Sequence, residues 1–227
     1  MLNSHLYEAA DGVSPYVAGN AAAPGMSGDV LGDTLAMMGS AMSFERNEEL
    51  FAEEEPADYV YKVVSGVVRT CKFLEDGRRQ IGEFHFPGDV FGFEPCANHT
   101  FSAEAVTPCR VVIVKRAALM AAAGRDAELG SALWIAATRE LGRLHEHMVL
   151  LGRKSARERV MAFLASAAER QCDAPVIDIP MSRQDIADHL GLTIETVSRT
   201  MTQLQDTGAI SLEGSRRVRV GPARLAA

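Results

Sequence analysis

The chain has 227 residues, of which 47% are hydrophobic, and carries a formal net charge of −7. This length favours two compact domains, and the apolar content is enough for each to bury a core. No apolar run reaches about eighteen residues, and no basic stretch followed by an apolar one stands at the N-terminus, so we expect neither a membrane span nor a secretion signal. We therefore predict a cytoplasmic location.

The acidic excess is confined to the first two thirds of the chain. Residues 153–227 hold 11 Lys and Arg against 9 Asp and Glu, whereas residues 1–152 hold 12 against 21. Charges separated by more than a Debye length of about 10 Å are largely screened. The net negative charge therefore does not exclude phosphate binding by the C-terminal third.

Residues 1–30 are rich in Ala, Gly and Ser and show no sustained period, which predicts a mobile tail. A short amphipathic segment at 32–42 and an acidic, solvated stretch at 44–56 follow. Over residues 59–116, short runs of β-branched and aromatic residues alternate with glycine turns. This pattern is typical of a small antiparallel barrel or jelly roll, which we place at residues 31–122.

A long helix is predicted next. Between Asp126 and Lys154 the chain lacks proline, and large apolar residues recur at alternating steps of three and four. These seam residues are Trp134, Ala137, Leu141, Leu144, Met148 and Leu151. The heptad pattern predicts a parallel coiled coil, so we assign residues 123–152 to a dimerisation helix and expect a homodimer. Packing of the same stripe against the chain's own barrel is the alternative.

The remaining residues, 153–227, contain a helix-turn-helix pattern. Ser182 can cap a first helix that Gly191 ends, and Thr193 can cap a second helix. The segment AISLEGSRRVRV predicts two strands about a turn, which makes the motif winged. An amphipathic helix, SARERVMAFLASAAERQ, and a short strand, VIDIP, come before it.

Polar residues near the start of the second helix share one exposed face, where a recognition helix meets base edges. Arg199 can bond guanine O6 and N7, Glu195 can accept from cytosine N4, and Ser198 can bond several bases. Ile194 can contact a thymine methyl. The natural phosphate contacts are Ser182, Arg183, Thr193, Thr196, Arg216 and Arg217. A helical hairpin with a solvated polar face is the alternative, but the short turn and the two caps agree with DNA binding.

The segment QDIADHLGLTIETVSRTMTQLQDTGAI resembles the helix-turn-helix of the CRP/FNR superfamily of bacterial transcription regulators. The pattern Glu195-Thr-Val-Ser198-Arg199 is similar to the FNR and FixK form. CRP has Arg in place of Ile194 and Gly in place of Ser198, so both departures point away from the CRP target. The resemblance, which extends loosely over residues 30–220, implies a palindrome of TTGAT, four spacer base pairs and ATCAA. It also implies an α+β fold: an N-terminal β-roll (jelly-roll) effector-like domain, a long dimerisation helix and a C-terminal winged helix-turn-helix.

We expect no cofactor. Residues 1–30 lack the cysteine cluster that holds iron and sulfur in FNR-type sensors. In CRP a Gly-Glu-Leu segment and an Arg-Ser pair hold the cyclic nucleotide. Here Gly92-Phe93-Glu94 stands for the first, and His99-Thr100, which cannot match the grip of Arg on phosphate, for the second.

The cysteines and histidines bear on two other ligand chemistries, haem and metal. A haem ligated by Cys71, His85 or His99 is an alternative, but single histidines in strands are usually structural. The four cysteines form no CxxC pair and no Cys/His cluster at metal spacing, so we expect reduced thiols and no metal. Cys172 is the thiol in the DNA-binding region and is therefore the candidate for redox control.

The resemblance also implies contact with RNA polymerase. The turn Leu74–Gln80 matches an activating patch of the superfamily, so we assign the contact to Glu75, Asp76, Arg78 and Arg79. The function expected is a homodimeric activator of FixK type that binds double-stranded promoter DNA, in microoxic metabolism or nitrogen fixation. The alternative is a ligand-gated regulator with a small effector in the β-roll. No GxSxG, HExxH or glycine-rich phosphate loop supports an enzyme.

Overall fold

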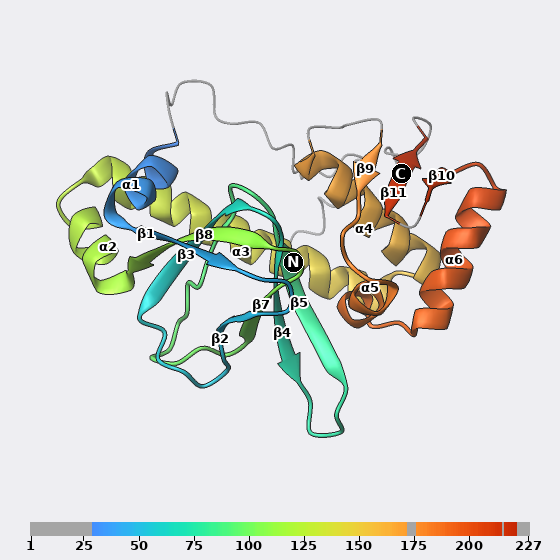
Figure 1. Cartoon of the computed structure of the whole chain (residues 1–227), viewed down its shortest axis with the longest axis horizontal. Helices are drawn as coiled ribbons and strands as arrows, with labels where there is room; N and C mark the ends of the chain where they lie inside the picture. Colours follow the sequence, from blue (N-terminus) through green and yellow to red (C-terminus); the bar gives the residue numbers. More distant parts are fainter. Residues whose placement is uncertain (1–28, 172–175, 215, 222–227) are drawn as a thin grey trace, which may run out of the picture.

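The computed structural model describes residues 29–171, 176–214 and 216–221. The described chain forms a β-roll, a long helix that runs behind it, and a helix-rich C-terminal domain beside the roll (Figure 1). The predicted α+β architecture, with a roll, a long helix and a winged helix-turn-helix in this order, is therefore confirmed.

The roll consists of two facing antiparallel sheets, with strand orders β1-β8-β3-β6 and β2-β7-β4-β5. Alternate side chains of both sheets point inward, and residues such as Phe51, Tyr61 and Val111 form a shared core. The strands are β1 (Ser40–Phe44), β2 (Glu49–Phe51), β3 (Tyr59–Ser65), β4 (Val68–Phe73), β5 (Arg79–His85), β6 (Val90–Phe91), β7 (Ser102–Ala105) and β8 (Cys109–Lys115).

One glycine is indispensable to the roll. Gly66 lies between β3 and β4 with φ of +80°, and a Cβ there would approach the Pro108 carbonyl oxygen to 2.4 Å. Any other residue would combine an unfavourable backbone conformation with a steric clash. The change from β3 in one sheet to β4 in the other therefore depends on this position.

Three helices accompany the roll: α1 (Val30–Met38), α2 (Arg116–Ala123) and α3 (Ala127–Arg153). The predicted amphipathic segment is thus a helix that ends at Met38, and β1 begins two residues later. The acidic stretch includes β2, and α2, which the strand-based prediction did not include, follows β8 directly. Its sequence RAALMAAA consists of strong helix formers, which explains the helix. Within the described ranges no helix is long and apolar enough to cross a bilayer.

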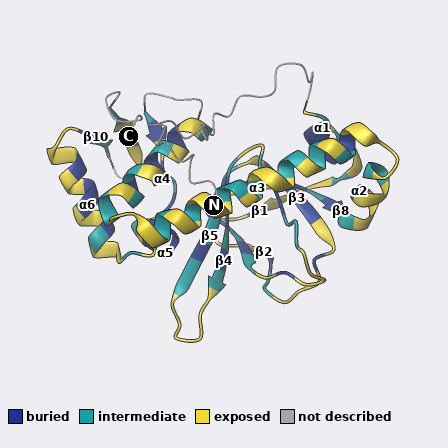
Figure 2. Cartoon of the chain, turned by 180° about the vertical axis from the view of Figure 1, so that it is seen from behind, coloured by how far each residue is buried: buried dark blue, intermediate teal, exposed yellow. Residues whose placement is uncertain are grey.

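The predicted long helix is confirmed as α3, capped by Asp126 and continuous through Gly152. One side packs on α1 and α2, where Leu129 is buried. The seam predicted for dimerisation faces outward: Trp134 is 72% exposed and Met148 is 64% exposed, and Leu141 and Leu144 are also exposed. Figure 2 shows the exposed residues along this helix from behind. Leu144 also lines a cavity between α3 and the roll, and Leu151 is half-buried, so the stripe is exposed mainly from Trp134 to Met148.

The C-terminal domain runs from α4 to β11. Its elements are α4 (Ala156–Arg170), β9 (Ile177–Asp178), α5 (Arg183–Leu190), α6 (Ile194–Asp206), β10 (Ile210–Glu213) and β11 (Arg217–Val220). Helix α4 begins with a capping box formed by Ser155 and Glu158. The strands form a sheet of order β10-β11-β9, which confirms the predicted wing.

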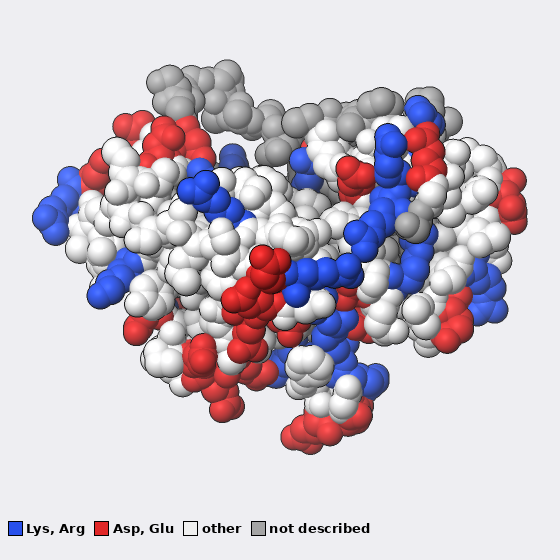
Figure 3. All heavy atoms as spheres, in the orientation of Figure 1, with Lys and Arg blue, Asp and Glu red and all other residues white. Residues whose placement is uncertain are grey.

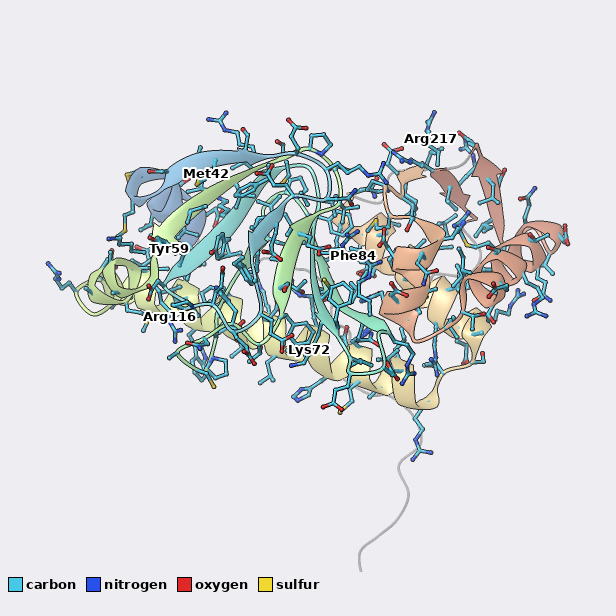
Figure 4. All side chains as sticks on the ribbon, turned by 60° about the horizontal axis from the view of Figure 1, so that its bottom comes forward. Met42, Tyr59, Lys72, Phe84, Arg116 and Arg217 are labelled. Carbon is cyan, nitrogen blue, oxygen red and sulfur yellow. The ribbon has the colours of Figure 1, made fainter. Side chains whose placement is uncertain are left out.

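The roll and the C-terminal domain share one apolar core. Ile81 and Phe84 of β5 belong to the same buried cluster as Phe163 of α4 and Leu190 of α5. Figure 4 shows Phe84 at the boundary between the two parts. Its ring lies 6.1 Å from that of Phe163, in edge contact. Continuous burial of this kind resembles a domain core more than a transient contact.

Candidate DNA-binding interface

The first helix of the motif, α5, is held at both ends by local geometry. Ser182 Oγ accepts a hydrogen bond from the Asp185 amide at 3.0 Å, and an Asp185 carboxylate oxygen accepts one from the Ser182 amide at 3.0 Å. Gly191 ends the helix with φ of +60°, in the left-handed region that glycine favours. These contacts confirm the predicted cap and turn, and they fix where the second helix begins.

The second helix, α6, begins at Thr193, whose hydroxyl accepts from the Thr196 amide at 3.2 Å. Val197, Met201 and Leu204 lie on its buried side. The pattern leaves the opposite side of the first turns to solvent.

The four predicted base-reading residues lie on that open side. Glu195, Ser198 and Arg199 are exposed, and Ile194 is 38% exposed. Within the described part of the chain, no carboxylate forms an ion pair with Arg199. Its guanidinium is therefore available for a partner outside the chain.

Glu195 is suited to accept hydrogen bonds. Its own backbone amide and the Thr193 hydroxyl bond the carboxylate, and with the nearby Arg199 they hold the pKa of Glu195 below its usual value. The side chain is consequently ionised at neutral pH, when it can accept only. A cytosine amino group is a matching donor.

The predicted phosphate contacts fall into two groups. Ser182, Thr193 and Thr196 lie at the helix starts, and their hydroxyls take part in the caps. Arg183, Arg216 and Arg217 are the cations. Figure 3 shows Lys and Arg gathered in a band over the C-terminal domain, while acidic residues gather over the lower part of the roll.

The surroundings of these cations differ. Burial lowers the pKa of Arg183, and no acid in the described ranges pairs with it. Arg216 is exposed and also lacks an ion pair among the described residues, whereas Arg217 lies 3.8 Å from Glu213. Arg183 and Arg216 are thus the least neutralised of the three.

The four residues predicted to contact RNA polymerase are not brought together. Glu75, Asp76 and Arg78 are exposed at the tip of the β4–β5 hairpin, where Arg78 pairs with Asp76 at 2.7 Å. Arg79, the next residue, points the other way. Its guanidinium lies 2.5 Å from Asp185 and 2.8 Å from Asp188 of α5.

A small cavity of about 210 Å³ lies between the roll and α3, where the superfamily resemblance placed a nucleotide. Its lining includes Glu83, Glu94 and Glu140 and no Lys or Arg. Glu94 bonds the Thr100 hydroxyl at 3.0 Å and lies 3.4 Å from His99. Small-molecule sites are usually larger, about 300–1,000 Å³. The cavity lining offers no cation to a phosphate, and Glu83 and Glu140 already pair with Arg170 and Arg143, which lie outside that lining.

His85, His99 and Cys71, the candidate haem ligands, are packed in the core. The His85 ring stacks on Phe91 with 4.3 Å between centroids, and the His99 ring stacks on Phe51 at 3.6 Å. Burial raises the pKa of the Cys71 thiol to about 11, which disfavours the thiolate. Among the described residues no three His, Cys, Asp or Glu side chains are grouped as metal ligands. Cys172, the predicted redox candidate, lies outside the described residues.

The sequence analysis missed the charges that join the motif to the roll. Asp185 was recognised as a first-turn residue, but its partner Arg69 was not. One signal was available: Arg69 shares a strand face with Cys71, which is fully buried. A charged residue on a buried strand face requires an acidic partner.

Comparison with known families and proteins agrees with this geometry. The family of cyclic nucleotide-binding domains matches residues 41–126, and the family of Crp-like helix-turn-helix domains matches residues 158–227.

Individual relatives are similar over most of their length. The chain is 53% identical to the nitrogen fixation regulation protein FixK of Azorhizobium caulinodans, over 81% of this chain and 76% of the relative. It is 43% identical to the transcriptional activatory protein AadR of Rhodopseudomonas palustris, over 70% of this chain and 68% of that protein. The solved structure of FixK2 from Bradyrhizobium japonicum superposes with a TM-score of 0.77 at 47% identity, over 80% of this chain and 92% of that chain.

Proposed function

The chain belongs to the CRP/FNR superfamily of transcription regulators and to its FixK group, and from this premise we propose that it is a homodimeric activator reading a TTGAT-N4-ATCAA palindrome. Its relatives are transcription regulators and not enzymes. The proposal concerns which bases are read, how the two half-sites are reached and what controls binding.

One observation carries the base-reading proposal: Glu195, Ser198 and Arg199 are exposed together on the first turns of α6, opposite its buried side. In the proposed complex this part of α6 lies in the major groove. Arg199 bonds O6 and N7 of the guanine in TTGAT, and Glu195 accepts from the amino group of the cytosine paired with that guanine in the same half-site. Ser198 bonds a neighbouring base, and Ile194 contacts a thymine methyl.

The exposed seam of α3 supports a dimer. A monomer would leave Trp134, Leu141, Leu144 and Met148 in water, and a parallel coiled coil buries them. Two-fold symmetry then presents two α6 helices about 34 Å apart, which is one turn of DNA. Arg183, Arg216 and Arg217 contact phosphates and supply affinity without sequence preference.

We propose that DNA binding requires neither a cyclic nucleotide nor a metal centre. The acidic lining and small volume of the roll cavity support the first point, because they suit a nucleotide phosphate poorly. Control then lies in synthesis and turnover of the protein or in oxidation of a thiol, with Cys172 as the candidate.

Activation requires contact with RNA polymerase, which we assign to the exposed hairpin residues Glu75, Asp76 and Arg78. Arg79 is left out of this patch because its side chain is engaged with α5. The names of the relatives, a nitrogen fixation regulation protein and a transcriptional activatory protein, support a role as an activator in nitrogen fixation. A cytoplasmic location and microoxic gene control are part of the same proposal.

Selection of bound duplexes from random DNA, with purified protein and no added effector, tests these points together. The expected product is the TTGAT-N4-ATCAA palindrome, with the guanine and cytosine as its strongest positions. Recovery of single half-sites would contradict the dimer. Recovery of unrelated sequence would contradict the assignment of Glu195 and Arg199.

A ligand-gated regulator is the second candidate, favoured by the match of residues 41–126 to cyclic nucleotide-binding domains. Such a protein would select no palindrome until its effector was added. Its melting temperature would also rise with that effector, since a ligand that binds only the folded state stabilises it. Cyclic AMP, cyclic GMP and cyclic di-GMP are the probes to compare.

A further inference from the structure

Four charged side chains join the roll to the first helix of the motif. Arg69 of β4 and Arg79 of β5 meet Asp185 and Asp188 of α5, and we call these four residues the Arg–Asp network. We propose that this network positions the DNA-binding domain on the roll in the orientation that binds DNA, so that no effector is needed to set it. The inference deepens the proposed function and rests on it.

The network is largely buried. Arg69 is 7% exposed and Asp185 is 4% exposed. Arg69 Nη1 donates to Asp185 Oδ1 at 3.1 Å, and its other two nitrogens donate to Glu104 on the neighbouring strand at 2.6 and 2.8 Å. Glu104 thus anchors Arg69 to the roll, and Arg69 holds Asp185.

Arg79 makes the second connection, with its fork divided between two carboxylates. Nη2 donates to Asp185 at 2.5 Å and Nε donates to Asp188 at 2.8 Å. A planar guanidinium satisfies both only when α5 has one position and one rotation relative to β5. The geometry therefore selects an orientation.

Asp185 links this contact to the DNA-binding motif directly. One of its oxygens, Oδ2, bonds Ser182 and caps α5, while the other, Oδ1, accepts from both arginines. The helix start that carries Ser182 and Arg183, both proposed phosphate contacts, is thereby fixed to the roll. Helix α6 follows α5 after a short turn at Gly191, so it is positioned by the same contact.

The other end of α5 is also held by β5. His189 Nδ1 lies 3.2 Å from the Ile81 carbonyl oxygen, and Gln80 donates to the His189 carbonyl at 3.3 Å. Elsewhere the contact is less continuous, since a cavity of about 720 Å³, lined by α3, α4, β5 and the end of α5, lies beside the edge contact of Phe84 with Phe163. Arg170 of α4 pairs with Asp89 beside that cavity. Rotation of the DNA-binding domain is therefore opposed mainly along α5.

Stability alone is a weak explanation for the network. Removing charges from water costs about as much as a buried ion pair returns, so apolar side chains would serve as well for cohesion. Apolar contacts tolerate small shifts of α5 relative to β5, whereas the two directional hydrogen bonds of the Arg79 guanidinium do not. What the charges add is a defined orientation.

The test compares two adjacent arginines. Arg79→Ala removes the contacts of this arginine with Asp185 and Asp188, and Arg78→Ala removes a neighbour that pairs with exposed Asp76. Binding to the TTGAT-N4-ATCAA duplex is measured by fluorescence anisotropy, without effector and well below the melting temperature. If loss of the fork leaves about a tenth of molecules in the binding orientation, affinity for Arg79→Ala falls about tenfold. Arg78→Ala should bind within twofold of the unchanged protein.

Two further measurements separate positioning from general destabilisation. Hydrogen exchange should rise along β5 and α5 in Arg79→Ala and stay unchanged in the β1–β8 sheet, whereas global destabilisation would raise both. Asp188→Asn should weaken binding, and adding it to Arg79→Ala should weaken binding little further, because both act through one contact.

The outcomes are distinguishable. Unchanged affinity and unchanged exchange in Arg79→Ala would overturn the network's role while the unchanged protein still selected its palindrome. If the unchanged protein did not prefer the palindrome, the proposed function would fail. The exchange comparison would then still decide whether Arg79 fixes α5.

Discussion

Asp185 and Glu195 occupy the first turns of consecutive helices, each behind a hydroxyl cap, yet their surroundings are opposite. Asp185 is buried against Arg69 and Arg79 of the roll, and Glu195 lies in solvent. The same local pattern thus produced a structural acid in α5 and a candidate base-reading acid in α6. Local sequence sets the caps, and distant chain segments decide which acid is free.

Of the changes that test this comparison, Asp185→Ala is expected to have the largest effect on stability. The change removes the carboxylate half of the capping box and leaves Arg69 and Arg79 with fewer acids in a buried site. Loss of one partner of a buried ion pair costs about 3–5 kcal/mol. We expect the free energy of unfolding, from urea titration followed by circular dichroism, to fall by about this amount. Glu195→Ala is the matched control and should leave the urea midpoint in place. Equal losses in both variants would contradict the comparison.

The difference between the two acids also marks what the sequence could predict. The caps at Ser182 and Thr193 and the turn at Gly191 depend on residues a few positions apart, and all three were predicted. The partner of Asp185 lies 116 positions away at Arg69. No local pattern reports that distance, so the contact between the two parts was not foreseen.

The same limit applies to the fold and to the hairpin. Periodicity predicted the roll strands and the long helix α3, whereas α2, with 8 residues, is too short for a helical period to stand out from the strand that precedes it. Arg78 and Arg79 look equivalent in sequence. Only the packing of β5 against α5 separates an exposed arginine from an engaged one.

Acid should loosen α5 from the roll while sparing α6. Burial lowers the pKa of His189 to about 3, so its ring stays neutral in the folded protein. In the unfolded chain the same ring takes up a proton below about pH 6.5. Its contribution to stability is therefore complete above pH 6.5 and is lost as the pH falls toward 3, by about 1.4 kcal/mol per pH unit at most.

Unfolding titrations between pH 7.5 and 4.5 measure this effect. His189→Gln should reduce the slope of stability against pH, because one buried titrating ring is removed. The control is His145→Gln, which makes the same substitution at an exposed position of α3. Burial also lowers the pKa of His85 to about 4, so part of the slope persists in both variants.

Arg199→Ala tests whether the exposed face of α6 reads bases. We expect a loss of about 1–3 kcal/mol for each half-site contact and a relaxed preference at the guanine, with folding unaffected. Competition binding with duplexes altered at that base measures the preference. Arg183→Ala is the control: it should weaken all duplexes alike and lower the salt dependence of binding. If the Arg199→Ala variant kept its full preference for the guanine, Arg199 would not be a base-reading residue.

The smallest expected effect on folding and DNA binding is at the hairpin tip. Glu75, Asp76 and Arg78 make no contact with α5 that the structure describes, so changing all three to Ala should leave the urea midpoint and duplex affinity unaltered. Transcription in vitro from a promoter with the palindrome should fall, because the proposed polymerase contact is lost. Arg79→Ala should instead lose transcription only in proportion to its lost DNA binding. If the triple variant transcribed normally, the polymerase contact would have to lie on another surface. The different roles of Arg78 and Arg79 would still be tested by the DNA affinities of their two variants.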